Sequence, residues 1–156
     1  MNNIETIIDH AEQNCKQHGG QLTNKRKQVL SALLKAGRAM SAYELVDYCK
    51  SEFDETLPAM SVYRILDFLQ QEQLVHKLKL ANKFIACSHI SCDHAHAVPQ
   101  FLICSNCQKV KEISINKQLL QELENNVADA GFHLVTPQFE MNCLCDECFS
   151  ATKTAN

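Results

Sequence analysis

The sequence predicts an α+β fold in which four helices and a two-stranded ribbon precede a small mixed unit of strands and one helix. Three observations support this prediction. Apolar residues recur at helical spacing through residues 3–73, and alternation with a period of two begins at Lys77. Two Cys-x-x-Cys units then accompany strand-like sequence in the last third of the chain. The 156 residues suffice for one domain or two small ones.

The first two helices have clear start and stop signals. Apolar residues at helical spacing predict a helix over residues 3–18, which Gly19 and Gly20 end. Thr23 can cap the second helix, because its hydroxyl can accept from a backbone amide of the first turn. Gly37 ends that helix.

The next two helices are also marked at their starts. Ser41 and Glu44 have the spacing of a capping box, which predicts a third helix. Pro58 can open a fourth helix over residues 58–73. The inward stripe expected for this fourth helix comprises Val62, Ile65, Leu66 and Leu69.

A two-stranded ribbon is expected next, from residues 74–80 and 83–87, with a turn at 81–82. The second to fourth helices followed by such a ribbon form the plan of a winged helix-turn-helix domain. The last helix of this plan fits the major groove of B-DNA, which admits one α-helix.

The remaining residues predict a small second domain. Residues 101–103 and 110–113 read as strands, Asn116 can cap a helix that Gly131 ends, and a third strand is expected from Phe132 to about Cys143. The expected divisions are a winged-helix DNA-binding domain at 1–87, a hinge linker rich in metal ligands at 88–99, a zinc-stabilised α/β dimerisation domain at 100–150 and a C-terminal tail at 151–156.

Four cysteines in this second domain predict a zinc site. Zn²⁺ prefers four tetrahedral ligands, and a two-residue gap lets both thiolates of one unit face the same ion. The rival interpretation is redox chemistry, but a thioredoxin-type motif has one Cys-x-x-Cys that opens a helix in a βαβ pattern. The sequence therefore favours a structural zinc that supplies folding energy to a domain too small to bury much core. Its predicted ligands are Cys104, Cys107, Cys145 and Cys148.

Composition limits the compartment and the partners. Nine cysteines and no recognisable signal peptide favour a reducing, cytoplasmic setting. No apolar run approaches the length that a bilayer requires. The net charge of −3 argues by itself against a nucleic-acid binder. Residues 1–80 nevertheless hold ten basic and ten acidic side chains, so a basic face within the first domain is permitted.

One basic cluster, Lys25-Arg26-Lys27, lies in the first turn of the second helix. Cations there are unfavourable for the helix dipole. These side chains either form a solvated charged face or bind phosphate, and their position alone does not decide between the two.

The combined motifs resemble the ferric uptake regulator family of bacterial metal-sensing repressors, with most similarity to its zinc-sensing branch. The resemblance covers almost the whole chain and is specific only when its motifs are taken together. They include Leu22-Thr23 with Arg26, Ser41-Ala42-Tyr43, Ser61-Val62-Tyr63-Arg64, Leu74-Val75-His76-Lys77, Phe101-Leu102-Ile103-Cys104 with Cys107, Val110-Lys111-Glu112, and Cys145 with Cys148.

The resemblance implies a homodimer that holds two Zn²⁺ per subunit and is not an enzyme. The family's hinge ligands match His76, Cys87, His96 and Glu112, which would hold a regulatory zinc between the domains. His96 is one choice among several, because His89, Cys92 or His94 could serve instead. A ligand set that includes a thiolate favours Zn²⁺ over Mn²⁺ or Fe²⁺. The family's further metal site, which uses a histidine after the long helix, is not expected because Pro137 stands there.

The implied activity is zinc-responsive repression. Zinc at the hinge would favour a closed dimer that binds palindromic operator DNA, with zinc-uptake genes as the expected targets. Arg64 is expected to read a purine, and Tyr43 and Tyr63 to contact phosphate or a thymine methyl group. The full expected DNA-contacting set is Lys25, Arg26, Tyr43, Ser61, Tyr63 and Arg64.

Three other functions are weaker hypotheses. The same fold could sense iron, manganese or peroxide, against which Cys87 argues modestly. A redox sensor could use the paired cysteines, Cys92 or Cys143. A zinc-dependent hydrolase or deaminase is disfavoured, because the chain has no His-Glu-x-x-His motif.

Overall fold

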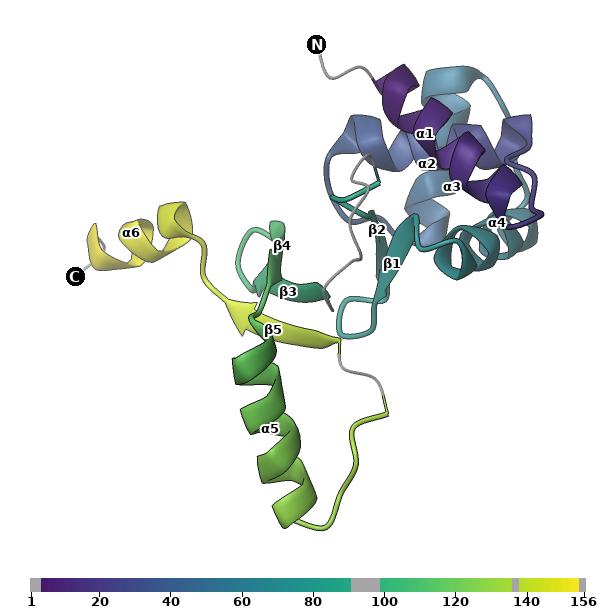
Figure 1. The fold of residues 1–156 in the computed structure, drawn as a ribbon. Helices are drawn as coiled ribbons and strands as arrows, with labels where there is room; N and C mark the ends of the chain where they lie inside the picture. The colour runs from purple at the N-terminus through teal and green to yellow at the C-terminus, as the bar shows by residue number, and fades with distance from the viewer. Residues whose placement is uncertain (1–3, 91–98, 136–137, 155–156) are drawn as a thin grey trace. The chain divides into compact units, whose positions relative to one another are not determined.

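The computed structural model describes residues 4–90, 99–135 and 138–154 of the chain. The chain divides into two compact units, Met1–Asp93 and His94–Asn156 (Figure 1). The α+β class predicted from the sequence is confirmed. Within the described residues, no helix has both the length and the apolar character needed to cross a bilayer.

The helices of the first unit begin and end where local capping permits. They are α1 (Ile4–Gln17), α2 (Asn24–Ala36), α3 (Ala42–Phe53) and α4 (Ala59–Gln71). Thr23 Oγ1 accepts from the Arg26 amide, and Gly37 takes a left-handed conformation (φ 63°) at the end of α2. Ser41 and Glu44 complete the predicted capping box of α3 with reciprocal bonds of 3.1 and 2.8 Å.

The inward faces of these helices form one apolar core. Helices α2, α3 and α4 pack on one another pairwise, and α1 packs on α2. The predicted stripe of α4 is confirmed, because Val62, Ile65, Leu66 and Leu69 are all buried. Pro58 is the N-cap of α4 rather than its first helical residue, and no side chain caps this helix.

A two-stranded antiparallel wing follows, made of β1 (Val75–Leu78) and β2 (Lys83–Ala86). His76 pairs with Ile85 in its register. A short bridge between Met40 and Phe84 joins β2 to the segment before α3, with backbone bonds of 2.9 and 2.8 Å. The predicted winged helix-turn-helix arrangement is therefore present.

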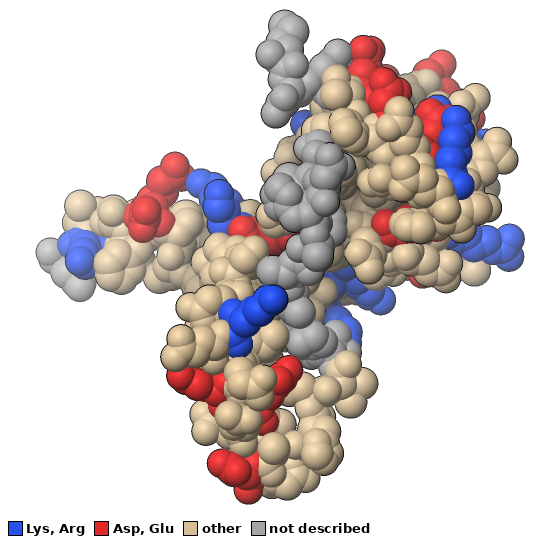
Figure 2. All heavy atoms as spheres, in the orientation of Figure 1, with Lys and Arg blue, Asp and Glu red and all other residues tan. Residues whose placement is uncertain are grey.

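The second unit holds a three-stranded sheet in the order β4-β3-β5. Its elements are β3 (Pro99–Cys104), β4 (Val110–Ser114), α5 (Lys117–Asp129), β5 (Phe139–Cys143) and α6 (Asp146–Thr154). Strand β4 pairs with β3 antiparallel, whereas β5 pairs with β3 parallel. Asn116 caps α5 as predicted, by accepting from the Leu119 amide at 2.7 Å. Acidic side chains gather over α5 in the view of Figure 2.

Three details differ from the sequence prediction. The last strand begins at Phe139 rather than at Phe132, because Phe132 and Val135 are 70% and 94% exposed and have no strand to pair with. A helix, α6, covers much of the expected tail and starts with Asp146 and Glu147, which suit the positive end of its dipole. Ile90, expected in the linker, is buried in the core of the first unit.

Candidate metal sites and nucleic-acid interface

The two Cys-x-x-Cys units meet in the second unit. Cys104 ends β3, Cys107 follows it in a turn, Cys145 precedes α6, and Cys148 lies within α6. All four sulfur atoms lie within 4.8 Å of one another, and those of Cys107 and Cys145 are 3.7 Å apart. Four thiolates at 2.3 Å from one tetrahedral Zn²⁺ would be about 3.8 Å apart. The donor set and its spacing therefore fit zinc.

The sheet topology brings the two units of cysteines together. Parallel pairing places Cys143 of β5 beside Cys104 of β3, so the chain leaves β5 next to the first cysteine unit. The Ser105 amide donates to the Cys143 carbonyl oxygen at 2.9 Å and fixes this approach. The turn back to β4 is closed by bonds from the Gln108 amide to the Cys104 carbonyl and from the Cys104 amide to the Lys109 carbonyl, both at 2.9 Å.

N–H donors are directed at two of the four sulfurs. The Cys145 amide donates to Sγ of Cys104 at 3.4 Å, and the Asn106 side-chain amide donates to Sγ of Cys148 at 3.3 Å. Sequence reasoning missed Asn106. The sequence signal that could have identified Asn106 is an amide side chain between the two cysteines of one Cys-x-x-Cys unit, where it can reach a thiolate.

The ionisation of this cluster is uneven. Backbone N–H groups, first that of Cys107 and then that of Cys145, lower the pKa of the Cys104 thiol to about 6. The Asn106 amide acts to lower the pKa of Cys148, but the neighbouring thiol of Cys145, burial and the other cysteines raise it to about 11. The Cys104 thiolate therefore forms more readily than the Cys148 thiolate. A divalent cation bound among the sulfurs would favour the thiolate form of its ligands.

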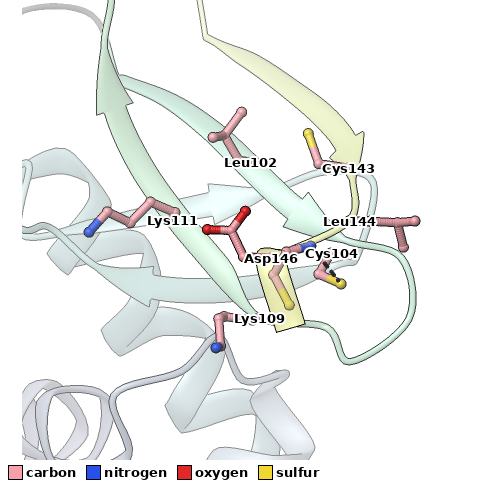
Figure 3. A pocket seen from close by; sticks show the side chains of 8 residues that line it. Leu102, Cys104, Lys109, Lys111, Cys143, Leu144 and Asp146 are labelled. Carbon is pink, nitrogen blue, oxygen red and sulfur yellow. Dashed lines mark hydrogen bonds between the residues drawn. The ribbon is translucent and has the colours of Figure 1, made fainter. Parts of the chain in front are cut away.

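A pocket of about 290 Å³ lies beside the cysteine cluster (Figure 3). Its lining combines apolar, basic, acidic and thiol side chains: Leu102, Cys104, Lys109, Lys111, Cys143, Leu144, Cys145 and Asp146. Cys143 lines this pocket but is not a member of the four-sulfur group.

Two of the four predicted regulatory ligands lie together in the first unit. His76 is on β1 and Cys87 directly follows β2, and their ligand atoms lie within 4.8 Å of each other. The Cys87 amide donates to the Leu74 carbonyl at 2.9 Å, which holds the cysteine against the start of β1. The His89 amide donates to Sγ of Cys87 at 3.4 Å.

The other two predicted ligands lie outside the described part of the first unit. Glu112 is on β4 of the second unit. His96, like Cys92 and His94, falls outside the described residues. His89 is described and half-buried, with Nδ1 3.3 Å from the Ser88 hydroxyl. The complete regulatory ligand set thus remains a prediction.

The residues predicted to contact DNA fall into two groups in the first unit. Tyr43 at the start of α3 is 67% exposed, and Arg64 on α4 and Lys25 on α2 are also exposed. Ser61 and Tyr63 on α4 are half-buried, and Tyr63 packs against the apolar core.

The basic cluster at the start of α2 divides between protein contacts and solvent. The Arg26 guanidinium lies on the Phe68 ring and donates to the Gln21 carbonyl, while Lys27 forms a 2.8 Å ion pair with Glu12. Among the described residues, Lys25 makes no such contact.

A winged-helix unit followed by a unit with four clustered cysteines is the architecture expected of a metal-dependent transcription regulator. The profile of the Ferric uptake regulator family matches residues 17–142, and this chain belongs to that family.

Individual relatives are similar over nearly the whole chain. The chain is 31% identical over 144 residues to the zinc uptake regulation protein of Escherichia coli (strain K12), covering 92% of this chain and 82% of that protein. It resembles the structure of a zinc uptake regulator complexed with zinc and DNA, with a TM-score of 0.82 and 27% identity over 98% of this chain and 99% of the other. It also resembles the crystal structure of holo XcZur, with a TM-score of 0.76 and 32% identity over 93% and 98% of the two chains.

Proposed function

We propose that this protein is a zinc-responsive transcriptional repressor that binds palindromic operator DNA as a homodimer in the cytoplasm. The observation that carries the proposal is the full-length similarity to a zinc uptake regulator solved with zinc and DNA. The winged helix and the four-cysteine cluster agree with it independently. Zinc-uptake genes are the proposed targets.

Two Zn²⁺ per subunit are proposed. Cys104, Cys107, Cys145 and Cys148 would hold the structural ion, because their donor type and spacing fit tetrahedral thiolate coordination. A zinc ion there would crosslink β3, the turn after it and α6. Such crosslinks supply folding energy in small metal-stabilised domains.

His76, Cys87 and Glu112, with His96 or another linker residue, are proposed to hold the regulatory zinc. His76 and Cys87 are positioned by the wing, whereas Glu112 belongs to the sheet of the second unit. A ligand set divided in this way would couple zinc binding to the angle between the units. DNA and zinc would then favour the same conformation, and each would tighten binding of the other.

The second unit leaves apolar side chains without cover. None of the residues of α5 is buried, and Leu119 and Phe132 are 52% and 70% exposed. A second copy of the chain is the proposed partner for this surface. A symmetric dimer would present two α4 helices to half-sites about one helical turn, 34–36 Å, apart.

On each half-site, α4 would enter the major groove. Arg64 is the proposed purine reader, since a guanidinium can donate to G O6 and N7 together. Tyr43 and Tyr63 are proposed to contact phosphate or a thymine methyl group, and Ser61 and Lys25 to contact the DNA backbone. Arg26 would contribute mainly to packing, because its guanidinium already contacts Phe68 and the Gln21 carbonyl.

The testing experiment is selection of duplexes from a random pool at buffered zinc levels, with metal counted per subunit. One tightly held zinc and a second that switches on binding to a palindrome would support the proposal. His76→Ala and Cys87→Ser should lose the switch and keep the tight zinc. His133→Ala and Cys143→Ser are matched controls, because both residues lie outside the proposed ligand sets.

Two results would contradict parts of the proposal. A protein that holds both zinc ions and selects no duplex at any zinc level is not a repressor of this kind. A protein that selects DNA only with Mn²⁺ or Fe²⁺ is a repressor of the same fold that senses a different metal.

A further inference from the structure

Met60 is a large apolar side chain that the structure leaves in solvent at the start of α4. It is 67% exposed, whereas the inward residues of the same helix are buried. Single exposed apolar side chains are common on proteins, so exposure by itself assigns no role. The position of Met60 on α4 is what indicates a role.

Helical spacing places Met60 on one outward stripe with Arg64, Asp67 and Gln71, and all four are exposed. This stripe is opposite to the face that packs on α2 and α3. No side-chain hydrogen bond caps the first turn of α4, whose N-cap residue is Pro58. Met60 is therefore at the accessible N-terminal end of the helix.

We propose that Met60 is a specificity-determining residue that contacts the 5-methyl group of a thymine in the operator. The inference rests on the proposed function, because it requires α4 to lie in the major groove. In a helix-turn-helix, residues near the N-terminus of the recognition helix contact the base edges. The thymine methyl is the apolar group that this groove displays.

The chemistry of methionine restricts what it can read. A thioether has no hydrogen to donate and is a weak acceptor, so it cannot replace a hydrogen bond to a base edge. It is flexible and polarisable, and it packs well against irregular apolar surfaces. A methyl group therefore suits Met60 better than any donor or acceptor in the groove.

The geometry of α4 also limits where the thymine lies. Met60 precedes Arg64 by four residues, or about 6 Å along the helix axis. Base pairs in B-DNA are about 3.4 Å apart. The thymine is thus expected within about two base pairs of the purine that Arg64 reads.

Thymine-to-uracil replacement tests the inference, because it removes only the methyl group. The duplex would be the one selected by the zinc-loaded wild-type dimer, with each thymine near the Arg64 contact replaced in turn. At one position the wild-type protein should lose about three- to tenfold in affinity, the scale of one buried methyl group. Met60→Ala should bind the unmodified duplex about three- to tenfold more weakly than the wild type does. Uracil at that position should not weaken its binding further.

Two further variants complete the design. Met60→Leu should restore most of the methyl preference, because leucine also presents an apolar tip. Gln71→Ala is the matched control, since Gln71 is exposed on the same stripe at the opposite end of α4. It should retain the wild-type response to uracil.

The outcomes separate this inference from the proposed function. If Met60→Ala distinguishes thymine from uracil at every position as the wild type does, Met60 reads no methyl group, although the repressor proposal stands. If the zinc-loaded wild type selects no duplex, the proposed function fails and this inference fails with it.

Discussion

The Arg26 guanidinium lies 3.6 Å from the centroid of the Phe68 ring, and its Nη1 donates to the Gln21 carbonyl oxygen at 2.6 Å. Arg26 is on α2 and Phe68 is on α4, so this contact joins the start of one helix to the proposed recognition helix. Gly20 lies against the same ring, where an added Cβ would be 3.4 Å from it.

Removing this contact should loosen α4. Arg26→Ala is expected to lower the free energy of unfolding of the first unit by about 1–2 kcal/mol, through the lost ring contact and the unpaired carbonyl. Amide hydrogen exchange in α2 and α4 of the zinc-loaded protein would report it. Unchanged exchange in both helices would show that the contact contributes little.

Lys25→Ala should weaken DNA binding and leave stability almost unchanged, because Lys25 is exposed. Stability should change by no more than about 0.5 kcal/mol. Operator affinity should fall for all sequences alike, and the slope of log K against log salt should decrease by about one, as for one lost phosphate contact. An unaltered slope would assign Lys25 to the solvated face that was the alternative interpretation.

The second unit should depend on its metal. Cys107→Ser is expected to lose the proposed structural zinc and to make the second unit sensitive to protease, because thiolate coordination of that ion would supply folding energy to the unit. Cys143→Ser, outside the four-sulfur cluster, should keep full zinc content. Zinc counting combined with limited proteolysis measures both. Retention of zinc by Cys107→Ser would argue against a four-cysteine site.

Asn106 should slow the loss of that zinc. Its amide donates to Sγ of Cys148 at 3.3 Å, and groups that hydrogen-bond metal ligands typically alter metal affinity 10- to 100-fold. We expect Asn106→Ala to release zinc to a chromogenic chelator about tenfold faster. Gln108→Ala is the control, because its amide donates to the Ser105 carbonyl instead. Equal release rates for the two variants would exclude the role of Asn106.

The capping box predicts a pH dependence. The Ser41 backbone N–H holds the pKa of Glu44 below its ordinary value of 4.5; burial opposes this effect and Lys83 assists it. Because the pKa is lower in the folded state, the stabilisation is present above pH 4.5 and is lost as pH falls through the folded value. The difference in unfolding free energy between wild type and Glu44→Gln should therefore shrink below pH 4.5.

Urea unfolding at several pH values measures this difference. Glu52→Gln, on the same helix but outside the capping box, provides the comparison. A difference between wild type and Glu44→Gln that stays constant from pH 6 to pH 3 would rule out the proposed contribution of the ionised carboxylate.

Much of the local structure follows from residues close in sequence. Thr23, Ser41 with Glu44, and Asn116 each bond to a residue three positions away, and the chain satisfies these bonds without reference to the rest of the fold. The metal-binding spacing of each Cys-x-x-Cys unit is local in the same sense.

Contacts between distant residues were not predictable in the same way. The sequence interpretation extended the last strand to Phe132 and left residues 151–156 as a tail, whereas pairing starts at Phe139 and α6 runs to Thr154. Strand limits depend on a partner strand, and the partner here is β3, some forty residues earlier in the chain.

The sequence by itself determined the order of helices and wing, their caps, the α+β class and the four cysteines that have metal-ligand spacing. Only the tertiary structure decided that β5 lies parallel to β3, that Cys143 stays outside the four-sulfur cluster, and that Arg26 contacts Phe68. Local patterns act through backbone geometry over three or four residues. Which distant side chains meet depends instead on how whole elements pack.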